Sequence, residues 1–425
     1  MLVAVGFVVL LVLGAPVAFM LGATGYLHLI AIGNPSFFDI VTQRMFAGVN
    51  QFSLMAIPFF ILAGELMNRG GVTAQLIEFS RDCVGHLRGG LAYVGVIVAM
   101  FLAAILGSAN AVAAILSSVL APEMIKDGFD DDFTAALIAA SSIIGPIIPP
   151  SVIFILYGVL SGTSVSALFL AGYVPGILLG TGYMIISYFQ AKRRNYPRYK
   201  ERFEPVKMLK SFVRALPALL VPVVIIGGIL SGAFTPTESG AIAVLVALVS
   251  GLFIYRKLRL RDIPGVLLNT GMITAGIMLI IAMGNIFGWT LAIDKIPTKF
   301  SDAVLGFTTN PNVVMMLVII LMLFVGCVME AFASMIVFTP VLAPLAVQVG
   351  IDPIHFGLVF SVLSSIALIT PPVGMCLFVT SGITGVPLSR MNKSVLPFVG
   401  MSVLALLIMA YVPETVLFLP RLLLR

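Results

Sequence analysis

The sequence is poor in charge. Only 10% of its 425 residues are Asp, Glu, Lys or Arg, whereas 60% are hydrophobic. A soluble globule of this size needs more polar surface than that composition supplies. The chain therefore belongs in a bilayer. A transmembrane β-barrel is excluded, because its strands would alternate polar and apolar residues and this sequence does not.

The sequence also lacks the motifs of common enzymes and pumps. It contains no GxxxxGK[ST], no GxSxG and no HExxH, so nucleotide-driven pumping and hydrolysis have no recognisable machinery here. Its cysteines are far apart and lack metal-binding spacing. We interpret Cys83, Cys327 and Cys376 as small core residues.

Long hydrophobic runs, by contrast, recur along the chain, and each can cross about 30 Å of hydrocarbon as a helix. They lie at residues 16–33, 50–68, 167–190, 214–233, 238–255, 265–288 and 394–419. Around Gly14-Ala15-Pro16 the sequence allows either two short passes or one kinked helix. The predicted fold class is an all-α polytopic membrane protein.

Basic residues cluster in two segments between these runs. Nine Lys or Arg fall between Lys192 and Arg214, and four more between Arg256 and Arg261. Short loops rich in Lys and Arg stay on the cytoplasmic side. The net charge of +6 thus indicates membrane topology and not a nucleic-acid partner.

Several features return about 222 residues later in the same register. Leu120-Ala121-Pro122 matches Leu342-Ala343-Pro344, and Pro149-Pro150 matches Pro371-Pro372. We predict two repeats, residues 1–190 and 238–425, joined by a basic cytoplasmic linker and connecting helix at 191–237.

Each predicted repeat contains a re-entrant hairpin and a broken helix, at 91–124 and 133–160 in the first and at 312–348 and 355–382 in the second. Residues 70–88 are expected to lie along the cytoplasmic interface. Following the basic segments from side to side, the first hairpin opens to the cytoplasm and the second opens outward. Such inverted repeats provide two states that face opposite sides of the membrane.

The first hairpin tip and its broken helix carry hard oxygen donors. Ser108 and Asn110 lie in the tip, and Gly145 and Pro149 interrupt the next helix, where proline leaves backbone carbonyls unpaired. Oxygen ligands without thiolate or imidazole favour a cation such as Na⁺. The alternative is a packing kink in which serine caps its own helix.

The second unit offers Glu330 and Ser334 at its tip and Thr370 at its break. A carboxylate at membrane depth is costly and is a functional candidate. Glu330 could join a second cation site, bind a proton, orient the substrate, or simply pair with an interfacial lysine. Glu65 is instead expected to form a local ion pair with Arg69.

An anionic substrate is expected between the two units, because broken helices point partly positive N-terminal ends into the cavity. The residues proposed to contact it are Ser142, Pro150, Ser364 and Pro372. An intramembrane enzyme built on Glu65, Glu330 and Asp130 to Asp132 lacks a nucleophile and base pair. A passive channel is disfavoured by the closed hairpins.

Four strings together resemble one known family, the large membrane subunit of tripartite ATP-independent periplasmic (TRAP) transporters. They are IPFFILAGELM at 57–67, GSANA at 107–111, IIPPS at 147–151 and TPPVG at 370–374. The resemblance covers essentially the full chain. It implies an elevator-type fold of the ion-transporter superfamily in the bacterial inner membrane, surrounded by lipid.

The resemblance also implies a mechanism and partners. Two Na⁺ would bind, one at Ser108, Asn110, Gly145 and Pro149, and the other at Glu330, Ser334 and Thr370. A separate four-helix membrane subunit and a periplasmic binding protein that delivers the substrate would complete the transporter. The chain looks most similar to sialic acid members; a C4-dicarboxylate transporter and a stand-alone Na⁺/carboxylate carrier are the alternatives.

Overall fold

The structure is helical, as predicted. The computed structural model describes residues 2–199, 203–327 and 329–424, and these residues contain no β-strand beyond one isolated bridge between Arg88 and Arg198. Eight helices within this part of the chain are long and apolar enough to cross a membrane. The all-α class is therefore confirmed.

Five helices precede the first hairpin. They are α1 (Leu2–Val12), α2 (Val17–Ile32), α3 (Ser36–Val49), α4 (Ala56–Arg69, after the 3₁₀ turn Phe52–Met55) and α5 (Val72–Val84). The chain breaks between α1 and α2, where Gly14 has a φ of 71°, so the open alternative resolves to two helices. The sequence reasoning missed α3, whose mixed polarity hides it among the hydrophobic runs.

The first hairpin and broken helix follow the expected plan. Their helices are α6 (Gly90–Leu106), α7 (Ala109–Val119), α8 (Ala121–Lys126), α9 (Asp131–Ser142), α10 (Val152–Ser161) and α11 (Val165–Arg193). Helix α9 ends at Ser142 and α10 begins at Val152, because four residues of the intervening segment are prolines or glycine. The Ser151 side chain caps α10 by accepting from the Phe154 amide.

A connecting region joins the two units. It contains α12 (Pro205–Leu230), α13 (Pro236–Val249, followed by the π-helical turn Ser250–Ile254), α14 (Ile263–Ile293, after the 3₁₀ turn Leu260–Asp262) and α15 (Ile296–Phe307). Helix α12 lies within the region 191–237 that was expected to hold a basic linker and a connecting helix; it begins at Pro205, whose fixed φ suits the first helical turn. Helix α15 was not predicted.

The second unit repeats the plan of the first. It consists of α16 (Pro311–Gly326), α17 (Ala331–Gln348), α18 (Pro353–Ala367), α19 (Met375–Thr384), α20 (Leu388–Tyr411) and α21 (Glu414–Leu423). The crossing predicted at 394–419 is shifted toward the N-terminus: α20 is long and apolar enough to cross a membrane but stops at Tyr411. Pro413 ends it, and α21 turns away to pack against α11.

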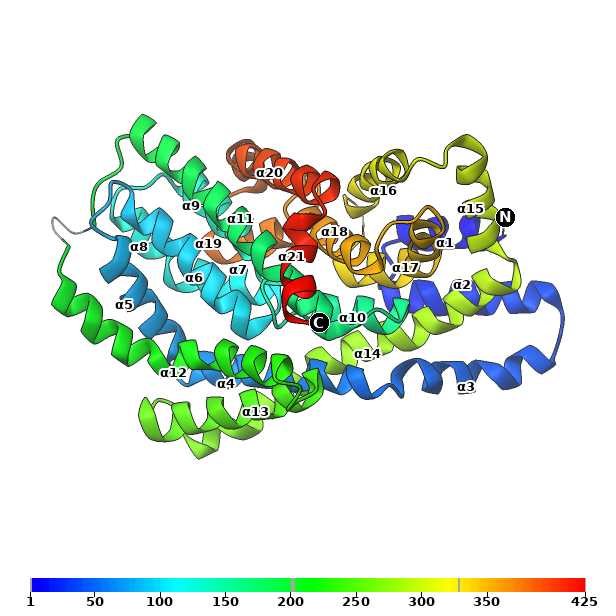
Figure 1. The fold of residues 1–425 in the computed structure, drawn as a ribbon, viewed down its shortest axis with the longest axis horizontal. Helices are drawn as coiled ribbons and strands as arrows, with labels where there is room; N and C mark the ends of the chain where they lie inside the picture. The colour runs from blue at the N-terminus through cyan, green and yellow to red at the C-terminus, as the bar shows by residue number, and fades with distance from the viewer. Residues whose placement is uncertain (1, 200–202, 328, 425) are drawn as a thin grey trace.

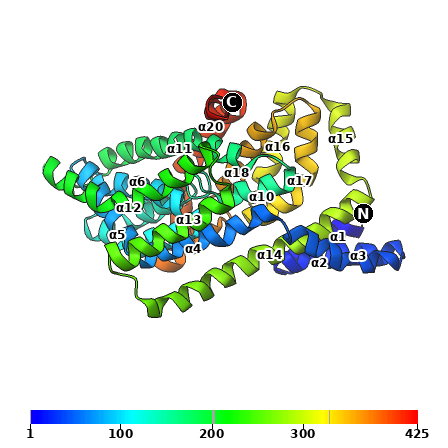
Figure 2. The same ribbon diagram turned by 60° about the horizontal axis from the view of Figure 1, so that its bottom comes forward.

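The molecule is elongated, with α1, α2, α3 and α15 at one end and α5, α8 and α12 at the other (Figure 1). Helix α14 runs along one edge toward α1 and α2 as a single long element (Figure 2), packing on α2, α3 and α4. Helix α4 also packs on α13. The hairpins and broken helices lie at the centre, within one continuous hydrophobic core.

Candidate functional site

The first hairpin tip lies against the first helix break. Gly107 ends α6 in the left-handed region, with a φ of 59°. A Cβ added there would lie 2.7 Å from the Pro150 carbonyl oxygen, and one added at Gly145 would lie 3.2 Å from the Ser108 carbonyl oxygen. Only glycine permits both approaches. The structure therefore brings Ser108 and Gly145, two of the predicted cation ligands, close to Pro150, a predicted substrate contact.

The backbone carbonyls of this break are mostly occupied. The Pro146 carbonyl accepts a hydrogen bond from Ser151, and the Pro149 carbonyl lies 3.5 Å from the Tyr173 hydroxyl. The Ser142 carbonyl accepts from the Gly145 amide at 2.9 Å. Pro149 and Ser142 thus have protein partners in this conformation, and a cation at their carbonyls would compete with those bonds.

The hydroxyl groups of the predicted site mostly share one arrangement. Four of them donate a proton to a backbone carbonyl three or four residues earlier in the chain, over 2.7–3.0 Å, and these groups belong to Ser142, Ser334, Ser364 and Thr370. A hydroxyl that donates in this way keeps its oxygen lone pairs. Local helix bonding and cation binding are therefore compatible at these four positions.

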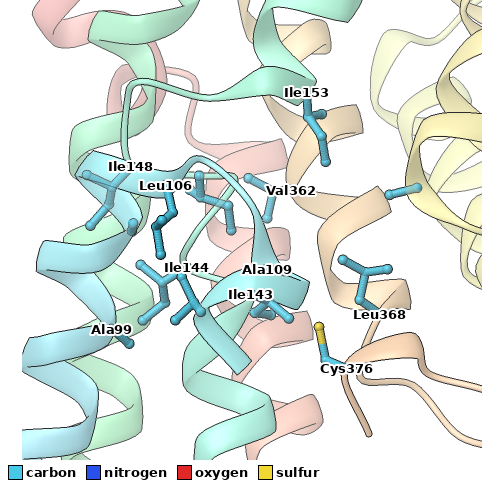
Figure 3. Packing of buried hydrophobic residues seen from close by; sticks show 14 of the residues in the cluster. Ala99, Leu106, Ala109, Ile143, Ile144, Ile148, Ile153, Val362, Leu368 and Cys376 are labelled. Atoms are coloured by element: carbon cyan, nitrogen blue, oxygen red, sulfur yellow. The ribbon is translucent and has the colours of Figure 1, made fainter. Parts of the chain in front are cut away.

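Asn110 contacts Cys376, which was interpreted from the sequence as a small core residue without a role in the site. The Cys376 thiol lies 3.5 Å from the Asn110 side-chain oxygen and also interacts with the Ser142 side chain. Cys376 is fully buried, beside Ala109, Ile143 and Leu368 (Figure 3). The core interpretation holds for its burial, yet this thiol joins the second unit to the first. Its place six residues after Thr370 was the available signal.

The second tip lies against the second break in the same way. A Cβ at Gly326 would lie 2.3 Å from the Ala367 Cβ, and the Cys327 thiol lies 3.7 Å from the Pro371 carbonyl. Among the residues that the structure describes, Thr370 forms no hydrogen bond with Glu330 or Ser334. The predicted ligands of the second cation site, Glu330, Ser334 and Thr370, therefore lie less close together than those of the first site.

Two acidic residues lack expected partners. Glu330 is the N-cap residue of α17, and its side chain caps no amide. Within residues 2–199, 203–327 and 329–424 it has no ion-pair partner, which disfavours the interfacial lysine alternative. The expected Glu65–Arg69 ion pair is not formed either; the Arg69 guanidinium lies 3.8 Å from the position of a Cβ on Gly265 in α14.

The acidic run at the start of α9, Asp130 to Asp132, is structural in character. Asp130 binds Arg194 at 2.7 Å and Tyr196 at 2.8 Å, and Asp131 pairs with Arg390 on α20. The Ser394 hydroxyl donates to Asp132. These contacts tie α9 to α11 and α20 and leave none of the three carboxylates as a free catalytic base.

The two breaks differ in exposure. Every residue from Ser141 to Ser151 is buried. In the second break Thr370 and Pro371 are half-buried, whereas Pro372 and Val373 are exposed. The four predicted substrate contacts thus divide, with Ser142, Pro150 and Ser364 buried and Pro372 open.

The family model of the tripartite ATP-independent periplasmic transporter, DctM component, matches residues 4–415. The chain belongs to this family. It is a large permease of a TRAP transporter and a multi-pass protein of the bacterial inner membrane. The resemblance in the sequence is therefore confirmed, and the protein belongs to a family of transporters.

Two curated relatives span nearly the whole chain. The sialic acid TRAP transporter large permease SiaM of Vibrio cholerae is 38% identical, over 98% of this chain and 97% of its own. The C4-dicarboxylate large permease DctM of Pseudomonas aeruginosa is also 38% identical, over 94% and 93%. The YdaH transporter of Alcanivorax borkumensis shares the fold, with a TM-score of 0.62, 14% identity, and coverage of 90% and 88%.

Proposed function

We propose that this permease couples the uptake of an organic acid anion to Na⁺ by alternating access. One observation carries the proposal: each hairpin tip lies against a helix break, Gly107 against Pro150 and Gly326 against Ala367. Interrupted helices at membrane depth are the places where transporters bind ions and substrates.

The donor set supports Na⁺. Ser108, Asn110 and Gly145 converge at the first tip, and their oxygens are hard, uncharged ligands. At the second tip, Glu330, Ser334 and Thr370 supply one carboxylate and two hydroxyls. Of the predicted ligands, Pro149 has the weakest support, because its carbonyl faces Tyr173.

The substrate is proposed to be an anion held near the N-terminal ends of α10 and α19. Both helices begin at the breaks, at Val152 and Met375, and helix N-termini carry partial positive charge. Relatives are named for sialic acid, C4-dicarboxylate, 2,3-diketo-L-gulonate and isethionate, which are all organic acids. Sialic acid is our first candidate, and C4-dicarboxylate is the alternative.

Reciprocal packing supports an inverted pair of units. Helix α10 of the first unit packs on α17 of the second, and α19 of the second packs on α7 of the first. Helix α10 also contacts α4 and its preceding 3₁₀ turn. The first turn of α19 contains exposed residues, whereas the first turn of α10, which is the matching helix of the other unit, is buried. We infer that the two hairpins and breaks move as one body, elevator-fashion, and that this conformation opens on the α19 side, toward the cytoplasm.

A small membrane subunit and a periplasmic binding protein are the proposed partners. The isethionate relative named DctMQ is longer than this chain, which spans 65% of it. A fused permease of that kind supports the expectation of a separate small subunit here. The binding protein would deliver the anion to the outer face.

Reconstitution tests this proposal. Vesicles containing the permease and small subunit should accumulate the anion only when Na⁺ and the binding protein are outside. Uptake with K⁺ in place of Na⁺ would refute the coupling, and uptake without the binding protein would indicate a stand-alone carrier. The ligand that copurifies with the binding protein identifies the substrate.

Single substitutions then test the sites. Asn110→Ala and Thr370→Ala should each raise the Na⁺ concentration for half-maximal uptake, and Glu330→Gln should change the Na⁺ or pH response. Ser118→Ala is a matched control, because Ser118 is exposed on α7 and bonds only to the Ala114 carbonyl. Unchanged Na⁺ activation in all three site variants would remove these residues from the proposal.

A further inference from the structure

A charged cleft lies between α5 and the first turns of α12, away from the tips and breaks. Its volume is about 290 Å³, and Arg81, Lys207, Lys210 and Arg214 line it together with two acids on α5. The acids are Glu78 and Asp82. A site that offers both cationic and anionic side chains suits a ligand that carries both charges.

The first turns of α12 place charge and apolar surface side by side. Lys207, Lys210 and Arg214 are spaced by three and four residues, so they share one face of the helix. Val206, Leu209 and Val213 repeat the same spacing one residue earlier, and each is at least 59% exposed. An amphipathic pattern of this kind is typical of a helix at the membrane interface.

The length of α12 places these turns at headgroup depth. Its 26 residues span about 39 Å at 1.5 Å per residue, whereas the hydrocarbon core measures about 30 Å. The last twenty residues contain a single charge, Arg214, so the apolar part fills the core. The turns around Lys207 and Lys210 therefore extend into the phosphate region on the basic, cytoplasmic side.

The cations of the cleft are not equally engaged. Arg81 is paired with Glu123 and lies over the Tyr199 ring at 5.3 Å. Lys207 and Arg214 form exposed ion pairs with Glu204 and Glu78, which are weak and exchangeable. Lys210 has no ion-pair partner among the residues that the structure describes. An incoming phosphate would find at least one free ammonium.

We propose that this cleft binds the headgroup of an ethanolamine phospholipid. The phosphate lies between Lys210, Lys207 and Arg214, the ammonium lies near Glu78, and the acyl chains descend along the exposed apolar stripe of α12. Basic pockets at the cytoplasmic face are known to suit lipid headgroups. Glu78 distinguishes this lipid from phosphatidylglycerol, which has no cation to offer it.

Lipid binding to the full chain, in complex with its small subunit, tests the proposal by native mass spectrometry. Dioleoyl-phosphatidylethanolamine should bind more tightly than the phosphatidylglycerol and phosphatidylcholine analogues. The Lys207→Gln/Lys210→Gln variant should lose affinity about tenfold or more. Glu78→Gln should lose the preference for ethanolamine over glycerol while it keeps phosphate binding.

Lys393→Gln is the matched control, because Lys393 is also an exposed lysine at the basic side but lies on α20, outside the cleft. Its affinity for the ethanolamine lipid should equal that of the parent. All variants are compared at equal unfolding temperature in lipid-free detergent, and a variant that unfolds early is replaced by the corresponding methionine substitution for lysine or alanine substitution for glutamate, which also removes the charge.

Four results would overturn the proposal. Equal binding of glycerophosphoethanolamine or inorganic phosphate would make the ligand a soluble phosphate. Tighter binding of phosphatidylglycerol would remove Glu78 from recognition. Binding by the free permease that disappears in the complex would assign the cleft to the small subunit. Full affinity in the double lysine variant would refute the site outright.

Discussion

The two hairpin-and-break units share a plan and differ in packing. In both, the tip of a helical hairpin lies against a proline-interrupted helix. Around the first break everything is buried, and α10 has neighbours in α4, α11, α17 and α18. Around the second break Pro372, Val373 and Met375 are exposed. Matching elements in different surroundings indicate one state of a two-state molecule.

The tips differ in chemistry as well. The first presents Asn110, whose oxygen faces Cys376 of the other unit. The second presents Glu330, which has no ion-pair partner in the described part of the chain. A tip with an amide side chain that contacts the other unit and a tip with an acidic side chain that has no such contact among the described residues would respond differently to a cation. The comparison therefore predicts unequal roles for the two tips in coupling.

The largest expected effect comes from adding a side-chain atom where the first hairpin tip contacts the first helix break. Gly107→Ala places a Cβ 2.7 Å from the Pro150 carbonyl and strains a φ of 59°, at a cost of about 1–3 kcal/mol. Uptake by reconstituted vesicles should fall more than about tenfold.

Gly162→Ala separates strain from contact. Gly162 has a φ of 76° but no atom within 4 Å of an added Cβ, so this variant carries strain alone. It should retain most of the uptake. Equal losses in the two variants would mean that backbone strain, and not the tip-to-break contact, causes the defect.

A second prediction measures the difference in exposure directly. Ile153 and Met375 occupy matching positions in the two units; Ile153 is 2% exposed and Met375 is 39% exposed. With the native cysteines replaced, Met375→Cys should react with a water-soluble maleimide much faster than Ile153→Cys. Substrate with Na⁺ should narrow the ratio by populating the opposite state. Equal reaction rates of the two cysteine variants in the resting protein would contradict the difference in exposure between the two breaks.

Much of this architecture could be predicted from particular residues. The pairs Pro149-Pro150 and Pro371-Pro372 predict the helix breaks, because proline cannot continue a helix. Gly107 predicts a turn. The exposure of each break could not be predicted, because the shared Pro-Pro pair gives no information about which neighbouring helices cover each break. The helical start at Pro205 was missed for another reason: a run of basic residues indicates topology and hides the periodicity of three and four.

Cys376 shows the same limit at the site. Its burial follows from its hydrophobic surroundings, but its contact with Asn110, 266 residues away in sequence, depends on how α19 crosses α7. The opposite error concerns Glu65 and Arg69. An ion pair was predicted from their spacing on one helix, but the two side chains do not pair. Tertiary packing decided both cases.

The smallest effect is expected at the helix starts that anchor each unit. Burial raises the pKa of the Asp132 carboxyl, but hydrogen bonds from Ser394 and Arg194 outweigh it, so the pKa lies below its usual value. Ser394→Ala should therefore weaken the start of α9 by about 1 kcal/mol, seen as faster amide hydrogen exchange there and not in α18. Asp352→Ala removes the cap bonds to Ile354 and His355. It should speed amide hydrogen exchange at the start of α18 by a similar amount and leave α9 unchanged.

The effect of Ser394→Ala should also depend on pH. A lowered pKa stabilises the fold only above the pKa of the unfolded chain, near 3.9, so the difference between Ser394→Ala and the parent should vanish as the pH falls through the pKa of Asp132. An effect that persists in acid, or that spreads to both helices, would contradict separate anchoring of the two units.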